Sequence, residues 1–235
     1  MLIRVIQTIV SGGSINFSSV IMQILAILFI IFCILPLHEC AHGWMAYKLG
    51  DNTAKYQGRL TLNPLASIDP IGAAAILLFG FGWAKPVPVD ARYFKNPKRD
   101  MAITALAGPV ANLLAAFVGA IVMNMILIFQ TSIPFEVLKW IYYFFEYYVI
   151  VNVMLAVFNL IPLPPLDGSR ILGAFLSDRA LYKYYQYQQY IMIGLFVILF
   201  AGLLDAPLQY LQAWITQGIT WLAGLPFHAF GFTTM

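Results

Sequence analysis

Five runs of uncharged residues dominate this sequence and determine the solvent in which it folds. They cover residues 5–37, 101–135, 147–166, 184–204 and 206–235, so each is at least 20 residues long. A helix of about 20 apolar residues crosses a bilayer. Only 10% of the residues are charged, whereas a soluble domain carries about 25%. The sequence therefore predicts an all-α polytopic membrane protein that lies in the lipid bilayer.

Lysine and arginine are concentrated in two parts of the chain, with eight between residues 48 and 99 and three between 170 and 183. Positively charged flanks of membrane spans stay in the cytoplasm. We therefore expect spans at about 17–49, 101–131, 141–166 and 186–204, and we leave open whether 206–226 is a fifth. The net charge of +3 is a topology signal, and it does not indicate binding to nucleic acid.

Residues 70–83 form an apolar stretch of 14 residues that contains three glycines. The stretch is too short to span a bilayer, and basic residues flank it on both sides, so a re-entrant segment fits best. The alternating pattern of 59–62 and the proline-rich 86–89 are typical of extended chain. The region of about 56–90 is predicted to be a short re-entrant β-hairpin or loop, within a single integral membrane domain of about four to five transmembrane helices.

The chemistry begins at His38, Glu39 and His42, which form an HExxH motif at the inner end of the first predicted span. Two histidines four residues apart lie on one face of a helix, a turn apart, which suits two ligands of one zinc ion. Ionisable side chains at the end of a long apolar helix are costly unless something compensates them. The motif therefore predicts a site for one Zn²⁺ per chain.

A catalytic zinc ion usually has three protein ligands and a water, so a third ligand is expected elsewhere in the sequence. A helix that enters the membrane near residue 143 brings Asp167 about 36 Å down, close to the depth of about 33 Å at which the first span places His38. Asp167 is thus the predicted third ligand. Asp69, in the re-entrant region, and His228, in the last run, remain alternatives.

Two motifs in this order resemble those of the site-2 proteases, which are intramembrane zinc metalloproteases. The first is HECAH at residues 38–42, and the second is NLIPLPPLDG at 159–168, of the type NxxPxxxLDG. Segments 58–64, 82–89 and 108–112 also look like the compact bacterial and archaeal branch, which has no PDZ module. The resemblance implies that the chain cleaves membrane proteins in or near a transmembrane segment, in the bacterial or archaeal cytoplasmic membrane. It also implies that Asn159 orients the substrate.

The residues themselves suggest how such a protease would work. Zinc held by His38, His42 and Asp167 would polarise the scissile carbonyl, and Glu39, about 100° around the helix from His38, would be the general base. Two other functions explain the same ligands: a non-catalytic membrane zinc protein or transporter, and a hydrolase of lipidated peptides. The spans offer few ionisable residues in their outer halves besides Glu146, which disfavours a transport path.

Overall fold

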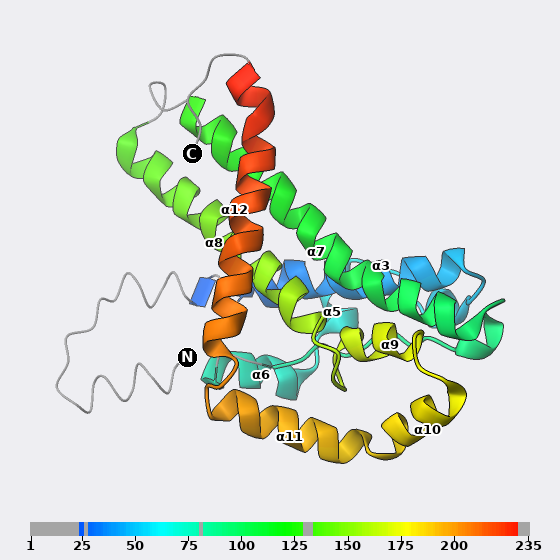
Figure 1. The fold of residues 1–235 in the computed structure, drawn as a ribbon. Coiled ribbons are helices and arrows are strands. Elements are labelled where there is room, and N and C mark those ends of the chain that lie inside the picture. The colour runs from blue at the N-terminus through cyan, green and yellow to red at the C-terminus, as the bar shows by residue number, and fades with distance from the viewer. Residues whose placement is uncertain (1–23, 26–27, 80–81, 129–133, 230–235) are drawn as a thin grey trace. The chain divides into compact units, whose positions relative to one another are not determined.

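The computed structural model describes residues 24–25, 28–79, 82–128 and 134–229, and the chain divides into two compact units, residues 1–93 and 94–235 (Figure 1). Helices make up the regular structure of these described residues, and they contain no strand. This confirms the all-α prediction. A helix suits a chain in lipid because it pairs the backbone N–H and C=O groups within a single segment.

The first unit is built on α3 (Leu35–Lys48), which follows directly on a π-helical turn, η1 (Ile30–Ile34). Pro36 stands in the first turn of α3. Proline has no N–H to donate four residues back, and its ring clashes with the carbonyl there, which here belongs to Phe32. The wider π turn, in which the Leu35 N–H donates to the Ile30 carbonyl, accommodates this proline within one continuous helix.

Short helices follow α3 in the first unit: α4 (Thr53–Tyr56), α5 (Pro64–Ser67), α6 (Pro70–Phe79) and the 3₁₀ turn η2 (Ala91–Tyr93). Both α4 and α5 pack against α3. The β-hairpin predicted for this region is not found among the described residues, since most of its apolar stretch is the helix α6.

Residues 59–62 and 86–89, which we expected to be extended, form no strand. Their neighbourhoods are joined by a side chain, because the Arg59 guanidinium donates to the Lys85 carbonyl at 2.7 Å. Pro86 and Pro88 have no N–H to give to a strand ladder. The alternating pattern of 59–62 therefore does not correspond to strand pairing among the described residues.

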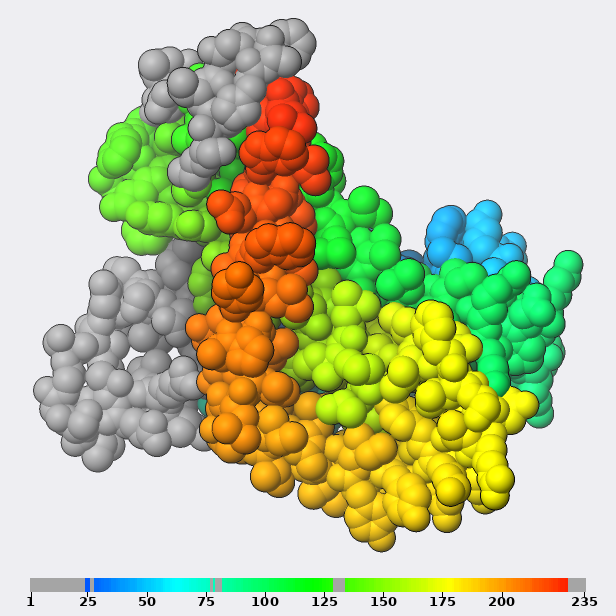
Figure 2. All heavy atoms as spheres, viewed as in Figure 1, coloured from blue at the N-terminus to red at the C-terminus, as the bar shows by residue number. Residues whose placement is uncertain are grey.

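The second unit is a helix bundle of α7 (Pro97–Ile128), α8 (Phe135–Asn159) and α12 (Asp205–Ala229). Its core joins Ala116 and Ala120 of α7 to Val149 and Val153 of α8, and α12 adds Leu208 and Ala223. The atoms of α12 form a column in front of α7 and α8, with which it is in contact (Figure 2). Small residues on α7 allow this close packing of helices.

Three shorter helices connect α8 to α12, namely α9 (Asp167–Gly173), α10 (Asp178–Gln186) and α11 (Gln188–Phe200). The chain bends by 84° between α11 and α12. Gly202, whose φ of +69° lies in the left-handed region that favours glycine, is in the turn between them.

Two of the described helices, α7 and α8, are each long and apolar enough to cross a membrane, and the bent pair of α11 and α12 would make a third span if it is one broken helix. On α7, large apolar side chains are exposed at every fourth position, at Leu106, Val110, Leu114 and Val118. Such an apolar stripe is unfavourable in water and suits contact with lipid. The protein is an integral membrane protein.

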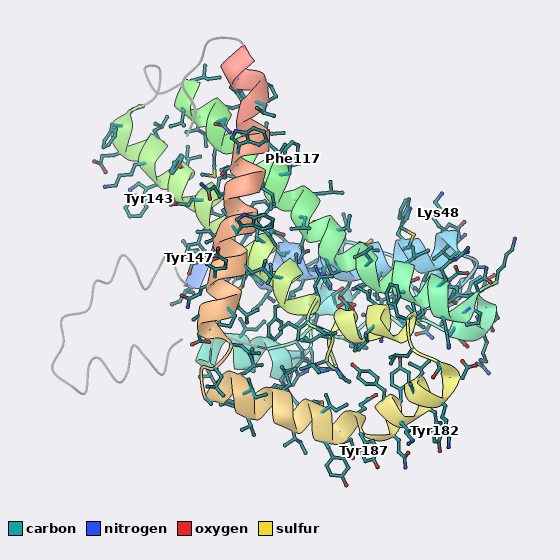
Figure 3. All side chains as sticks on the ribbon, in the orientation of Figure 1. Lys48, Phe117, Tyr143, Tyr147, Tyr182 and Tyr187 are labelled. Carbon is teal, nitrogen blue, oxygen red and sulfur yellow. The ribbon has the colours of Figure 1, made fainter. Side chains whose placement is uncertain are left out.

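The predicted span limits differ from the helices in an informative way. A span was predicted at about 141–166, but α8 covers Phe135–Asn159. The helix ends there because the prolines that follow Asn159 cannot continue it. The first residues of the span predicted at 17–49 lie outside the described part of the structure, and its inner half is helical in η1 and α3. Exposed tyrosines at 143, 147, 182 and 187 project from α8, α10 and the turn after α10 (Figure 3), and membrane–water interfaces are rich in such side chains.

Candidate metal centre

The HExxH motif lies in the middle of α3 and is helical, as predicted. His38 and His42 are both buried, with 6% and 5% of their surfaces exposed. Their Nε2 atoms are 3.0 Å apart, and the two rings lie edge to face with their centroids 4.6 Å apart. One turn of helix therefore directs two imidazole nitrogens to the same point in the first unit.

This spacing fits two ligands of one zinc ion. Two nitrogens at about 2.05 Å from a tetrahedral zinc ion are about 3.3 Å apart, which is close to the 3.0 Å between the Nε2 atoms of His38 and His42. Imidazole is a preferred ligand of zinc, so the type of donor fits as well as the distance.

Glu39 is half-buried and lies next to His38 in sequence. Its Oε2 atom accepts a hydrogen bond of 2.8 Å from the backbone N–H of Val87. Consecutive residues of a helix project about 100° apart, so Glu39 does not share the face of the two histidines. The Glu39 carboxylate therefore has its own hydrogen-bond partner, the Val87 N–H, on a different face of α3 from the two histidines.

Asp167 is the first residue of α9 in the second unit, and its side chain is partly exposed. The chain reaches it from the end of α8 through the turn at 160–166. Gly168 closes this turn, because a Cβ atom at that position would lie 2.3 Å from the carbonyl oxygen of Leu160. The second motif therefore needs a glycine at position 168, because no side chain fits there. The role of Asp167 as a ligand stays a prediction.

Gly168→Ala is expected to lower the melting temperature of the purified protein, because the added methyl group would meet the backbone carbonyls of Leu160 and Ile161. Such overpacking costs about 1 to 3 kcal/mol, and backbone atoms cannot turn away as a side chain does. Thermal unfolding in detergent measures it. Gly218→Ala in α12 is the matched control, since a Cβ there meets nothing within 4 Å. Equal melting temperatures for the two variants would contradict the packing argument.

Asn159 is the last residue of α8 and is partly exposed. Its Nδ2 atom donates a hydrogen bond of 3.0 Å to the carbonyl of Leu155, one turn earlier. The side chain therefore has a local helical partner, and its role toward a substrate stays a prediction.

Of the two alternative zinc ligands, Asp69 and His228, the structure describes the side chain of Asp69. Asp69 caps α6, since its Oδ1 accepts from the N–H groups of Ile71 at 2.9 Å and Gly72 at 3.1 Å, and its Oδ2 accepts from the Trp83 indole at 3.3 Å. A carboxylate with three such bonds has a structural role in the first unit. The side chain of His228 lies outside the described part of the structure.

Asp51 and the Val87 amide were not among the residues predicted to lie near the HExxH motif. Asp51 is fully buried, and its carboxylate accepts hydrogen bonds from the N–H groups of Thr53 and Asp90. Buried carboxylates are rare unless they are paired. The only signal in the sequence is the position of Asp51 just after Gly50 at the end of the motif helix.

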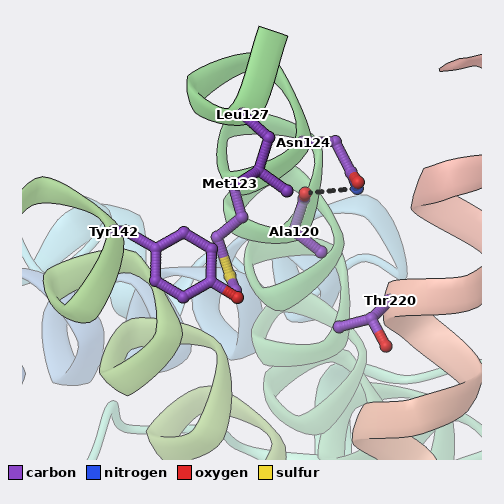
Figure 4. Close-up of a pocket in the computed structure, with 6 residues that line it drawn as sticks. All are labelled: Ala120, Met123, Asn124, Leu127, Tyr142 and Thr220. Atoms are coloured by element: carbon purple, nitrogen blue, oxygen red, sulfur yellow. Dashed lines mark hydrogen bonds between the residues drawn. The ribbon is translucent and has the colours of Figure 1, made fainter. Parts of the chain in front are cut away.

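A small cavity of about 20 Å³ lies in the second unit between α7, α8 and α12 (Figure 4). It has room for about one water molecule. None of the residues predicted for the metal centre lines it. The lining residues are Ala120, Met123, Asn124, Leu127, Tyr142 and Thr220.

Comparison with known proteins identifies the family of this chain. The model of Peptidase family M50 matches residues 120–202, a range that contains Asn159 and Asp167. YwhC of Bacillus subtilis is 43% identical over 172 residues, which cover 70% of this chain and 74% of that protein. It bears the name "Putative zinc metalloprotease".

Two further relatives bear the same name. Rip2 of Mycolicibacterium smegmatis is 32% identical over 61% of this chain and 54% of its own length. The archaeal protein MJ0611 of Methanocaldococcus jannaschii is 34% identical over 57% of this chain and 62% of its own length. No solved structure matches the chain significantly. With 43% identity over about three quarters of a metalloprotease and a matching family model, the chain belongs to Peptidase family M50 and is a zinc metalloprotease.

Proposed function

We propose that this metalloprotease hydrolyses peptide bonds in or near the transmembrane segments of membrane protein substrates. The observation that carries the proposal is the pair of buried imidazole nitrogens, 3.0 Å apart, on a helix that also bears Glu39. The apolar stripe on α7 supports a lipid environment for the reaction.

We propose Asp167 as the third zinc ligand, beside His38 and His42. A catalytic zinc site needs a third protein ligand, and a carboxylate is a common choice. Support comes from the position of Asp167 at the start of α9, after the apolar helix α8. Of the alternatives, Asp69 already uses both carboxylate oxygens, since Oδ1 caps α6 and Oδ2 accepts from the Trp83 indole.

When bound, a zinc ion at this site polarises the scissile carbonyl and makes water a nucleophile near neutral pH. Glu39 receives a proton from the attacking water and afterwards gives it to the leaving amine. Its Oε2 atom is held by the Val87 N–H, so Oε1 is the oxygen that serves proton transfer. His38 and His42 bind the metal and do not move protons.

The substrate must unwind before it is cut, because the amides of a transmembrane helix are paired within the helix. We propose that the unwound segment adds as a strand near residues 59–62 or to the re-entrant region. Asn159, at the end of α8, is the proposed amide that orients it.

We further propose that the chain is one protease domain with four to five spans and that its active site faces the cytoplasm. In this arrangement α6 enters the membrane and returns, because its 10 residues reach only about 15 Å. We propose the bacterial or archaeal cell membrane as the location of the protein, because the relatives are proteins of bacteria and of an archaeon.

Cysteines introduced at Lys55 and Lys95, in a variant without Cys33 and Cys40, are expected to react with a membrane-impermeant reagent from the cytoplasmic side only. Both positions belong to the basic region that stays inside the cell. Labelling of intact cells and of inverted vesicles provides the measurement. If the two positions react from opposite sides, residues 70–83 cross the membrane. Asp167 would then lie about 30 Å from the histidines and could not share a zinc ion with them.

The proposed function is tested by reconstituting the protein in vesicles with a single-span model substrate. We expect cleavage within or beside the span, loss of cleavage with a zinc chelator and recovery when zinc is added back. Mass spectrometry of the products locates the cut bond. Cleavage of prenylated peptides alone would favour the lipidated-peptide hydrolase, and zinc binding without any product would favour the non-catalytic protein.

A further inference from the structure

Residues 86–90, which we call the strap, are tied to the motif helix by two carboxylates of the first unit. The Val87 N–H donates to Glu39 Oε2 at 2.8 Å, and the Asp90 N–H donates to Asp51 Oδ2 at 2.7 Å. Glu39 lies within α3, and Asp51 comes just after the end of this helix. The strap therefore has one anchor beside the metal-binding histidines and one at the far end of α3.

The proline pattern of the strap determines which of its amides are available. Pro86 and Pro88 have no N–H, so the Val87 amide is the single donor in that part of the strap. Alternating prolines favour the polyproline II conformation, which has three residues per turn and rises about 3.1 Å per residue. Residues 87 and 90 then face the same side, about 9 Å apart, and both direct their N–H groups toward carboxylates.

A glycine on α3 allows the strap to lie this close. A Cβ atom at Gly43 would be 3.2 Å from Cγ1 of Val87, a spacing at which a neighbour has to shift. Val87 itself is buried, with 6% of its surface exposed. Gly43 follows Glu39 by four residues, so the valine packs one helical turn from the carboxylate that its amide contacts.

Asp51 is held in place by hydrogen bonds other than the one that it makes with the strap. Its Oδ1 atom accepts from the backbone N–H of Thr53 at 2.9 Å and also from the Thr53 hydroxyl. The residue is fully buried, so its charge depends on such bonds. The second oxygen, Oδ2, then determines where Asp90 is held.

We infer that the strap is a positioning device for Glu39 and that Asp51 sets its register on α3. The inference rests on the proposed role of Glu39 as the base. A glutamate side chain has several rotatable bonds and loses conformational freedom when it is held in one geometry. The Val87 N–H fixes one carboxylate oxygen, and Asp51 fixes the strap that carries this N–H. Asp51 and Val87 are thus positioning residues.

Val87→Pro removes the amide hydrogen but is compatible with polyproline II backbone, whereas Val87→Ala keeps the hydrogen and shortens the side chain. With the zinc-loaded protein and a single-span model substrate in vesicles, Val87→Pro should lower kcat about tenfold or more, with KM and zinc content retained. Val87→Ala should lower kcat several times less. Equal rates for the two variants would overturn the inference.

Asp51→Asn tests the second anchor, because an amide nitrogen in place of Oδ2 cannot accept from the Asp90 N–H. This variant should lower kcat with zinc retained, and adding it to Val87→Pro should cause little further loss, because both act through one contact. Losses that multiply in the double variant would show that Asp51 acts by another route.

Hydrogen exchange of the strap amides tests the geometry without any substrate. Asp51→Asn should speed exchange at Asp90, and Glu39→Ala should speed it at Val87, whereas Glu146→Ala in α8 is the control. Unchanged exchange at both amides would overturn the inference. If the unmodified protein cleaves nothing while the exchange rates change as expected, the proposed function is wrong, but the positioning of Glu39 by the strap is still supported.

Discussion

Glu39→Gln is expected to keep about one zinc ion per chain, and its proteolytic rate should fall by about a hundredfold or more. Glutamine has nearly the same shape, and its carbonyl oxygen can still accept the hydrogen bond that the Val87 N–H gives to Glu39. The amide cannot take up a proton as a carboxylate does. Metal analysis and the rate of cleavage of a single-span substrate, measured on the same preparation, separate binding from catalysis.

Glu146→Gln, the same chemical change at a carboxylate in α8, is the matched control for this experiment and should cleave normally. Normal cleavage by Glu39→Gln would remove Glu39 as the general base. The inactive variant also serves as a trap, since a substrate that binds without being cut can be purified with it and identified.

His38→Ala, His42→Ala and Asp167→Ala are each expected to weaken zinc binding by about a hundredfold or more, because each removes one of the three proposed protein ligands. The histidine variants test the observed pair of Nε2 atoms. The aspartate variant tests the proposed third ligand. Zinc content after dialysis, together with competition against a chelator of known affinity, measures the loss, and proteolysis should fall with the metal.

Asp69→Ala and His228→Ala provide the comparison for the third ligand. If Asp167 completes the site, both should keep their zinc, although Asp69→Ala should destabilise α6 by removing its cap. Retention of zinc by Asp167→Ala together with loss by His228→Ala would reassign the ligand to the C-terminal helix.

The residues of the motif helix were predictable because their chemistry depends on local geometry. Histidines four apart on a helix are neighbours whatever the rest of the fold does, and the two Nε2 atoms are 3.0 Å apart. The all-α class followed as reliably from the uncharged runs, since a backbone in lipid has few ways to pair its polar groups.

Helix limits were less predictable because uncharged runs end at charged residues and helices do not. The helix α7 begins at Pro97 and includes Lys98, Arg99 and Asp100. Long basic side chains at the end of a span can extend to the interface, and the buried Asp100 accepts from the Asn96 N–H and the Arg99 guanidinium. The predicted hairpin is not found among the described residues for a different reason. Its two extended segments were predicted from the alternation of 59–62 and the prolines of 86–89, and their neighbourhoods are joined by the Arg59 side chain instead.

The partners of Glu39 and Asp51 on the strap were beyond reach of the sequence, because they are backbone amides. Every residue except proline carries the same N–H group, so nothing in the sequence marks Val87 or Asp90 as the donors that contact these carboxylates. Their selection depends on the register of residues 86–90 along α3, and that register follows from tertiary contacts such as the one between Val87 and Gly43.

The strap also limits how this protein meets other extended chains. Of its five residues, Pro86 and Pro88 have no N–H, and Val87 and Asp90 direct theirs inward to carboxylates. An open β-edge would invite sheet growth between neighbouring copies, and prolines are a common protection against it. The strap therefore offers few free backbone donors along which a second extended chain could add.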